Sequence, residues 1–226
     1  MQLCGVSMSP FFERVMIGLD IKGAINDVDY PGVPGGFKSA DHLETNPSGK
    51  IPYLIRTDGK SMGESQVILE YLDQKLEGPK LVPASPEVAA DAKVVCRVFD
   101  DEVMPAMWPF LKSLNWGITD EDAIRTAKEE RLPRGLDCLE FYMGEGKRAV
   151  SDEWTVADCA LIPFVFQAQN FLSRFEITDL GNRPKLNAWM ERVSETDIFE
   201  RSMQRIRTSI KEVMAARKAG EVSKTA

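Results

Sequence analysis

The sequence is poor in histidine, and its few cysteines stand far apart. His42 is the only histidine, so a histidine metal cluster, an HExxH motif and any mechanism with two imidazoles are excluded. Cys4, Cys96, Cys138 and Cys159 form no CxxC pair, so neighbouring thiols cannot build a zinc site or a dithiol redox motif. We therefore expect reduced cysteines and no bound metal.

Long apolar runs are also missing. The longest run without a charged residue, Cys159 to Ser173, has 15 residues and includes Pro163 and several amides, whereas a membrane span takes ~20 apolar residues. The first twelve residues are uncharged and carry no basic stretch, unlike a secretory signal. We expect no membrane span and a cytoplasmic location.

Positive charge is in deficit. Lysine and arginine total 28 against 35 for aspartate and glutamate, a net charge of −7 with an isoelectric point near 5.0. Such a surface repels phosphate backbones, so nucleic acid is not an expected partner. The 226 residues, 43% of them apolar and 28% charged, are typical of one large or two small globular domains.

Two kinds of periodicity divide the chain. The first eighty residues mix strand and helix patterns. The predicted elements are a strand at Met1–Gly5, a helix at Pro10–Lys22, strands at Ile25–Tyr30, Tyr53–Thr57 and Lys60–Gly63 with an Asp58-Gly59 hairpin turn, and a helix from Ser65. We assign residues 1–78 to this α/β domain and residues 79–85, rich in turn formers, to a linker.

The rest of the chain shows almost no strand signal. Helical patterns are predicted from Pro86 onward and at Asp120–Tyr142, Val156–Phe171, Pro184–Val193 and Asp197–Met214. Pro105 and Pro109 should bend or end the first long helix, because proline lacks the amide donor. Residues 86–216 are thus predicted to form an all-helical bundle domain, and residues 217–226 a disordered tail.

The segment from Asn46 to Ile55 predicts a peptide-binding edge. Pro52 stands directly before an apolar strand, where its missing amide is tolerated, and the Ile51–Pro52 bond is a candidate for the cis form. A cis bond would turn the backbone of Ile51 outward and offer its amide and carbonyl to an extended peptide. The alternative is an ordinary trans proline that opens a strand.

Glu64 and Ser65 stand where a strand ends and a helix begins. Ser65 and the first helical amides suit a carboxylate, because unpaired N–H groups and the positive end of the helix dipole meet there. Glu64 can hold an ammonium group beside it, so the pair fits the head group of an amino acid. The alternative is simple helix capping by Ser65.

Ser9 precedes the first long helix, with Pro10 at its first position. A serine without a neighbouring base is a poor nucleophile, but its hydroxyl can donate a hydrogen bond to a thiol and so lower the thiol pKa. Ser7 competes as the donor, and an N-cap role for Ser9 is the alternative.

These motifs together resemble those of the serine-type cytosolic glutathione transferases, bacterial, tau or zeta in kind. The resemblance runs from about Met1 to Phe199 and rests on Ser9-Pro-Phe followed by Arg14-Val15, on Asn46-Pro with Gly49-Lys-Ile-Pro52, and on Glu64-Ser65 with Ile68 to Leu72. It implies a thioredoxin-like α/β N-terminal domain followed by an all-α C-terminal domain, with glutathione as co-substrate.

The resemblance also implies roles for single residues. Ser9, or alternatively Ser7, would stabilise the glutathione thiolate. Ile51 beside cis Pro52 would pair with the cysteinyl backbone, Lys50 would meet the glycyl carboxylate, and Glu64 with Ser65 would hold the γ-glutamyl end. His42 could approach the glycyl end, although a surface histidine is the preferred interpretation.

An apolar pocket for the second substrate is implied between the domains. The candidates are Met8, Phe12, Met104, Met107, Trp108 and Leu111, with plain core packing as the alternative. Thr155 and Asp158 have the spacing of a helix capping box, and Trp189 resembles a packing position of the family. We assign these three residues to folding.

The implied reaction is transfer of the glutathione sulfur to a hydrophobic electrophile, or reduction of organic peroxides, in detoxification. One alternative is a glutathione-dependent isomerase of the maleylacetoacetate type, although the run of two serines and a cysteine typical of that branch is not matched by Ser7-Met8-Ser9. Another is a non-catalytic protein that binds glutathione or other ligands on the same fold. The resemblance further implies a homodimer.

Overall fold

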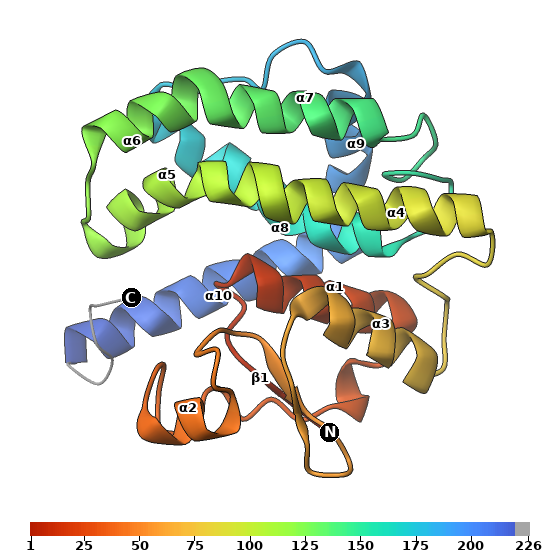
Figure 1. Cartoon of the computed structure of the whole chain (residues 1–226), viewed down its shortest axis with the longest axis vertical. Coiled ribbons are helices and arrows are strands. Elements are labelled where there is room, and N and C mark those ends of the chain that lie inside the picture. The colour runs from red at the N-terminus through yellow and green to blue at the C-terminus, as the bar shows by residue number, and fades with distance from the viewer. Residues whose placement is uncertain (220–226) are drawn as a thin grey trace. The chain divides into compact units, whose positions relative to one another are not determined.

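The chain divides into two compact units. Figure 1 draws the ribbon of the whole chain and labels its helices and strands. A computed structural model describes residues 1–219. Residues 1–82 and the last helix form the first unit, and residues 83–196 form the second. The division between Val82 and Pro83 lies inside the predicted linker, but the last helix belongs to the first unit and not, as the sequence analysis had it, to the helical one.

The first unit is built on a three-stranded antiparallel sheet in the order β1-β2-β3. The strands and helices of residues 1–82 are β1 (Gln2–Cys4), α1 (Pro10–Lys22), α2 (Ala40–Thr45), β2 (Tyr53–Ile55), β3 (Ser61–Met62) and α3 (Ser65–Lys75). Leu3 lies opposite Leu54 in the register, and both are fully buried. Their side chains pack against Val15 of α1 and Ile68 of α3, so both helices bury their apolar stripes in one core.

The predicted strand at Ile25–Tyr30 is wrong. Residues Ile25–Asp27 form the 3-10 helix η1, and only a single parallel bridge joins Asp29 to Gln2. The N–H of Leu3 donates to the carbonyl of Asp29 over 2.9 Å. Asn26 and Asp27 favour local turns over extended backbone, which explains the difference.

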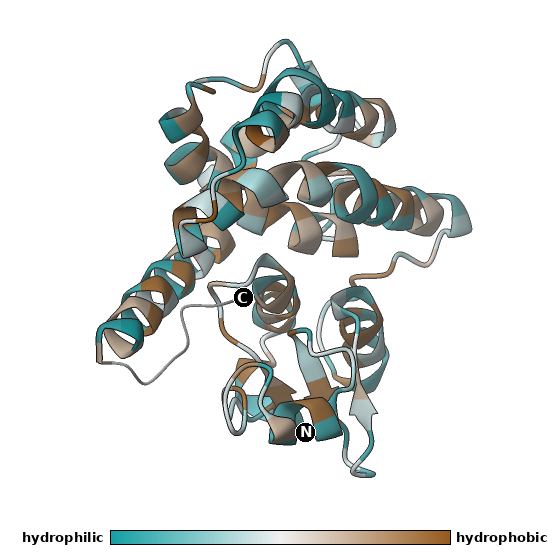
Figure 2. Cartoon of the chain, turned by 60° about the vertical axis from the view of Figure 1, so that its left-hand side comes forward, coloured by the Kyte–Doolittle hydropathy of each residue, from teal (hydrophilic) through white to brown (hydrophobic). Residues whose placement is uncertain are grey.

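Helix α10 (Asp197–Ala219) returns the chain to the first unit. Figure 2 shows hydrophobic and hydrophilic residues alternating along it. Arg201 forms an ion pair with Asp20 over 2.9 Å, and Arg205 pairs with Glu13 and with Asp20, each over 2.8 Å. Because α10 ends at Ala219, the predicted disordered tail begins too early; residues 220–226 of that tail lie outside the described part of the chain.

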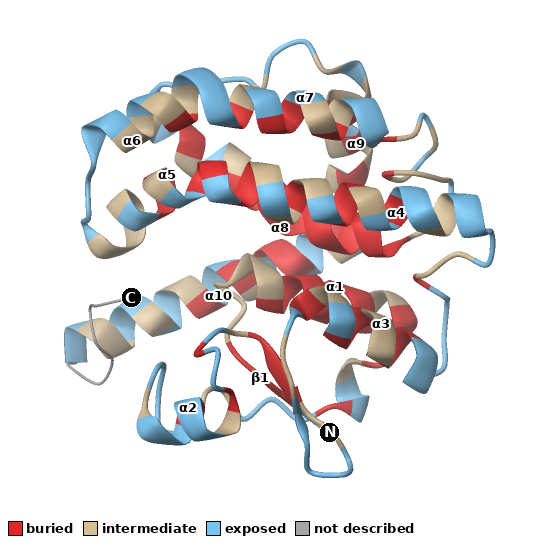
Figure 3. Cartoon of the chain, viewed as in Figure 1, coloured by how far each residue is buried: buried red, intermediate tan, exposed pale blue. Residues whose placement is uncertain are grey.

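The second unit consists of helices. Its α-helices are α4 (Pro86–Val98), α5 (Met104–Trp116), α6 (Glu121–Thr126), α7 (Leu132–Tyr142), α8 (Val156–Phe171) and α9 (Pro184–Ser194), and a 3-10 turn, η4 (Leu172–Phe175), follows α8. Figure 3 shows α8 buried along most of its length. Its long apolar run places it at the centre of this unit, since a helix that is apolar all round is buried.

Wide π turns carry two of these helices past prolines. The π segment η2 (Phe99–Val103) joins α4 to α5, whose second residue is Pro105, and η3 (Ala127–Arg131) joins α6 to α7, whose second residue is Pro133. A proline cannot donate an amide hydrogen bond and crowds the preceding turn, and a widened turn accommodates both effects. The helix therefore continues through Pro105 instead of ending there.

The predicted capping box at the start of α8 is confirmed. The N–H of Thr155 donates to the Asp158 carboxylate over 3.0 Å, and the Thr155 hydroxyl accepts from the N–H of Ala157 over 3.3 Å. Asp158 also accepts from the indole N–H of Trp189 and from the N–H of Ala149, both over 2.9 Å. These contacts support the assignment of Thr155, Asp158 and Trp189 to folding.

Two further findings bear on the sequence analysis. The four cysteines are free thiols. Within residues 1–219, none of the helices has the length and apolar character that crossing a membrane requires.

Candidate functional site

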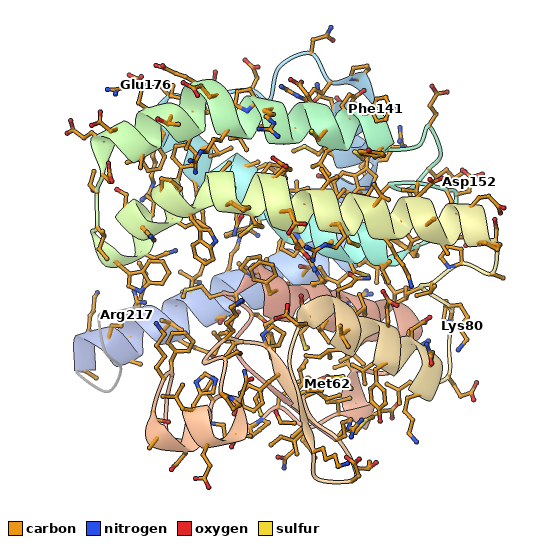
Figure 4. All side chains as sticks on the ribbon, viewed as in Figure 1. Met62, Lys80, Phe141, Asp152, Glu176 and Arg217 are labelled. Carbon is orange, nitrogen blue, oxygen red and sulfur yellow. The ribbon has the colours of Figure 1, made fainter. Side chains whose placement is uncertain are left out.

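The register of the sheet brings three loop segments together at one end of its strands. Cys4, the last residue of β1, pairs with Tyr53, the first residue of β2, so Gly5 leaves the sheet beside Pro52. β3 runs antiparallel to β2 with Met62 opposite Leu54. The chain beyond Met62, which is labelled in Figure 4, therefore leaves β3 at the same end of the sheet. The segments 5–9, 49–52 and 63–65, predicted separately from the sequence, therefore meet at one end of the sheet.

The first segment ends in the N-cap of α1. The N–H of Phe12 donates to Ser9 Oγ over 3.4 Å, and the N–H of Glu13 donates to the Ser9 carbonyl over 3.0 Å. Gly5 has φ 150°, and a side chain there would overlap the ring of Phe12, which requires glycine. The Ser9 hydroxyl thus lies at the positive end of the α1 dipole, where an anion is stabilised.

Ser7 has different surroundings. Burial raises the pKa of Glu13, whose carboxylate is fully buried, while Arg205, and to a smaller extent the hydroxyls of Ser7 and Ser202, act to lower it. Ser7 is therefore associated with a buried carboxylate of α1, whereas Ser9 caps the helix. The hydroxyls of Ser7 and Ser9 therefore have different partners, although both are candidates for the thiol donor.

The second segment carries the expected cis peptide between Ile51 and Pro52, and the alternative of a trans proline is wrong. Asn46 Nδ2 donates to the Lys50 carbonyl over 2.8 Å, which holds the chain just before that peptide. Within the described residues, the backbone N–H and C=O of Ile51 have no hydrogen-bond partner. The Lys50 side chain is exposed. An extended peptide can therefore pair with Ile51 and place a carboxylate near Lys50.

His42 lies beneath this segment and is fully buried, so the expectation of a surface histidine is wrong. Its Nε2 donates to the Lys50 carbonyl over 3.3 Å, and its Nδ1 accepts from the N–H of Lys38 over 3.0 Å. The ring stacks on Tyr53 with centroids 5.2 Å apart. Because the carbonyl can only accept and the amide can only donate, Nε2 is the donor and Nδ1 the acceptor in these two contacts.

The reason for the burial of His42 is helix α2. Ser39 caps that helix by accepting from the N–H of His42 over 3.1 Å, and the ring contacts of His42 with Lys38, Lys50 and Tyr53 hold the imidazole in the interior. The sequence signal was present, since serine stands three residues before His42, but the segment was assigned as irregular.

We expect His42→Ala to weaken the binding of glutathione, the ligand that the resemblance implies, about tenfold with little change in kcat. The variant removes a hydrogen bond to the Lys50 carbonyl and leaves the Lys38 amide without its acceptor, an effect of about 1–2 kcal/mol. Titration calorimetry with glutathione measures the affinity. Glu44→Gln, an exposed change in the same helix, is the control, and equal affinities in the two variants would contradict the role of His42.

The third segment has an unusual backbone. Glu64 is exposed and adopts φ 64° and ψ 106°, a region that non-glycine residues rarely occupy. Such a conformation costs about 1–3 kcal/mol and is characteristic of ligand sites. The first amides of α3 follow directly, so a carboxylate bound there would meet free N–H groups and the dipole.

The role of Ser65 differs from simple capping. Glu64, not Ser65, is the N-cap residue, and no side-chain capping bond is present. The Ser65 hydroxyl instead accepts from Arg14 Nη1 over 3.2 Å, and both residues are buried. The Arg14 guanidinium places a positive charge behind the start of α3, which favours an anionic ligand. The sequence analysis quoted Arg14 only as part of a motif and missed this contact.

The six residues expected to line an apolar pocket belong to both units. Met8 and Phe12 lie in the first unit, and Met104, Met107, Trp108 and Leu111 lie on α5 in the second. Phe12, Met104, Met107 and Leu111 are buried, which agrees with the alternative of core packing, whereas Trp108 is 39% exposed. A cavity of about 310 Å³ within the second unit is lined by other residues, among them Leu132, Leu136 and Ile177.

Comparisons with known proteins agree with this architecture. Residues 3–80 match the family model described as glutathione S-transferase, N-terminal domain, and residues 122–192 match that of its C-terminal domain. Glutathione S-transferase L3 of Arabidopsis thaliana is 30% identical over 192 residues, which are 83% of this chain and 75% of that protein. The maleylacetoacetate isomerase of Rattus norvegicus is 31% identical over 168 residues, 70% of this chain and 73% of that protein.

A solved structure gives the same result. The maleylacetoacetate isomerase of Methylobacterium extorquens AM1, determined with bound malonate and glutathione, superposes with a TM-score of 0.71 at 25% identity and covers 90% of this chain and 96% of that one. The chain belongs to the glutathione S-transferase family. It is a glutathione transferase with glutathione as its co-substrate, and its fold is the expected α/β N-terminal domain followed by a helical domain.

Proposed function

We propose that the three loop segments at this end of the sheet bind glutathione in one orientation. The backbone of Ile51 beside Pro52 pairs with the cysteinyl residue, Lys50 meets the glycyl carboxylate, and Glu64 with Ser65 holds the γ-glutamyl head group. The observation that carries this proposal is the register of β1, β2 and β3, because it directs all three segments to the same end of the sheet. Glutathione has its two carboxylates at opposite ends, as this arrangement requires.

We propose further that Ser9 stabilises the glutathione thiolate, with Ser7 as the alternative donor. A free thiol has a pKa of about 8.5, and a fall of two units, about 2.7 kcal/mol, makes it mostly ionised at neutral pH. The Ser9 hydroxyl and the N-terminal amides of α1 supply a donor and a positive dipole at the point where the sulfur would lie. The thiolate then attacks an electrophilic carbon, where it displaces a leaving group or adds to a double bond, or it attacks a peroxide oxygen, where the O–O bond breaks and an alcohol leaves.

The second substrate is proposed to be hydrophobic. Met8 and Trp108 are the accessible members of the predicted set, and methionine adapts to ligands of varied shape. Isomerisation is the second candidate reaction, because relatives named maleylacetoacetate isomerase are as similar in sequence as those named glutathione S-transferase. A non-catalytic binding role is the third. The intact set of Lys50, Pro52, Glu64 and Ser65 argues against it, because a scaffold has no need of a complete glutathione site.

Assembly, location and physiological role are also proposals. We propose a cytoplasmic homodimer that acts in detoxification, with the first domain of one chain against helix α4 and the following turn of the other. Val67 on α3 is apolar and 52% exposed, as a residue covered by a partner would be. Sedimentation of the purified chain measures the assembly: a dimer supports the proposal and a monomer contradicts it.

One experiment tests the proposed reaction. The purified protein is assayed with glutathione against an activated aryl halide, an organic hydroperoxide, an isothiocyanate and a maleyl isomerisation substrate, and retention on immobilised glutathione is recorded alongside. We expect retention and turnover of the conjugation or peroxide substrates. Turnover of the maleyl substrate alone would select the isomerase. Retention without turnover of any substrate would favour the binding role, and absence of both would contradict the assignment of Lys50, Ile51 and Glu64 to glutathione.

A further inference from the structure

A residue of the last helix contacts the loop that carries the two candidate thiol donors. The backbone N–H of Met8 donates to Ser209 Oγ over 3.0 Å, across 201 positions of the sequence. Met8 stands between Ser7 and Ser9, and Ser209 is only 7% exposed. The contact is therefore partly buried, and it acts on the backbone of the loop and not on a side chain.

The other hydrogen bonds of this loop are local. The N–H of Gly5 donates to the Gly32 carbonyl over 3.1 Å, and the N–H of Ser9 donates to the Val6 carbonyl over 2.9 Å. Within the described residues, Ser209 is thus the one partner of the loop amides that comes from beyond residue 32. Without it, the N–H of Met8 loses the one hydrogen-bond acceptor that it has among residues 1–219.

Ion pairs determine where Ser209 meets the loop. Arg201 pairs with Asp20 over 2.9 Å, and Arg205 pairs with Glu13 over 2.8 Å. Ser209 follows Arg205 by four residues, one further helical turn on the same face. From residue 201 to residue 209 α10 advances about 12 Å, and its partners change from Asp20 and Glu13 on α1 to Met8 in the loop before α1. The register between α1 and α10 therefore places Ser209 at the Met8 amide.

We infer that Ser209 is a positioning residue for the thiol-binding loop, which it orients through the Met8 amide. This inference rests on the proposed function, since it assigns to Ser209 the alignment of the Ser9 hydroxyl, or that of Ser7, with the glutathione sulfur. A donor at a developing anion must be aligned before the reaction to be effective. Ser209 itself touches neither sulfur nor electrophile in this proposal.

The test compares three variants of the full chain. Ser209→Ala removes the acceptor, Ser209→Thr retains an oxygen at the same position, and Thr208→Ala removes a hydroxyl from the exposed neighbouring position as the control. The readout is the pKa of enzyme-bound glutathione, taken from the pH dependence of kcat/KM and from the ultraviolet absorbance of the bound thiolate. A purely structural role would change stability but not this pKa.

We expect Ser209→Ala to raise the pKa of the bound thiol by about one unit and to lower kcat/KM at neutral pH about tenfold. Ser209→Thr should stay close to the wild type, and Thr208→Ala should equal it. An unchanged thiol pKa in folded Ser209→Ala would overturn the inference, as would an equal shift in Thr208→Ala.

Ser209→Cys and the exchange rate of the Met8 amide provide two further tests. If Ser209→Ala does not fold, Ser209→Cys replaces oxygen by a weaker acceptor of similar size, and an unchanged thiol pKa in that variant overturns the inference. Failure of the proposed function is recognised separately, because the wild type itself would then show no bound thiolate. In that case the exchange rate of the Met8 amide decides whether Ser209 orders the loop at all, and equal exchange in wild type and variant overturns that as well.

Discussion

Asp158→Ala is expected to lower the free energy of unfolding by about 4 kcal/mol or more. Burial raises the pKa of Asp158, and hydrogen bonds from Trp189, Ala149 and Thr155 oppose that rise. Four donors meet at this carboxylate, since Thr155 contributes both its amide and its hydroxyl. Each buried donor left without a partner costs about 1–3 kcal/mol. Whole domains are stable by about 5–15 kcal/mol, so the loss is a large part of the total.

A second aspartate provides the control for this prediction. Asp120 caps α6 through a single contact, from the N–H of Ala123 over 3.0 Å, and it is exposed. Asp120→Ala should therefore cost about 1 kcal/mol, the usual value for one lost cap. Denaturant unfolding of both variants measures the difference. Similar losses in Asp120→Ala and Asp158→Ala would mean that the capping box acts as an ordinary cap and not as the centre of a buried network.

Much of the fold could be predicted because its strongest signals are local. Pro10 and the αL glycine Gly23 bound α1 at the expected residues, and the capping box places the start of α8. The strand expected at Ile25–Tyr30 failed because its apolar residues suit a short helical turn equally well once Asn26 and Asp27 are considered. Periodicity over six residues does not separate the two.

Contacts between distant segments could not be predicted in this way. The placement of α10 on α1 depends on ion pairs such as that of Arg205 with Glu13, 192 positions apart. Nothing in the local pattern of either helix selects its partner, since both read as ordinary amphipathic helices. For the same reason the sequence did not predict that Arg14 donates a hydrogen bond to Ser65, although both residues stand in recognised motifs. Sequence patterns thus identified the segments that meet at one end of the sheet, but not the distant residues that contact them.

Ser9→Ala is expected to lower turnover about a hundredfold and to change glutathione affinity little. Loss of one hydrogen bond to a developing anion costs about 3 kcal/mol in the transition state, whereas the ground-state thiol makes a weaker contact. The variant also removes the N-cap of α1, which accepts from the N–H of Phe12, so stability should fall by about 1 kcal/mol. Steady-state kinetics with a saturating electrophile measures turnover, and thermal unfolding measures stability.

Ser9→Gly separates these two effects, because glycine is nearly as good an N-cap residue as serine and costs only a few tenths of a kcal/mol. If the hydroxyl acts on the sulfur, Ser9→Gly and Ser9→Ala lose turnover equally although their stabilities differ. If turnover instead follows stability, Ser9 is only a helix cap. Ser7→Ala then becomes decisive: a hundredfold loss there, with mild effects at Ser9, would transfer the role of thiol donor to Ser7 and make its neighbour Glu13 part of the same site.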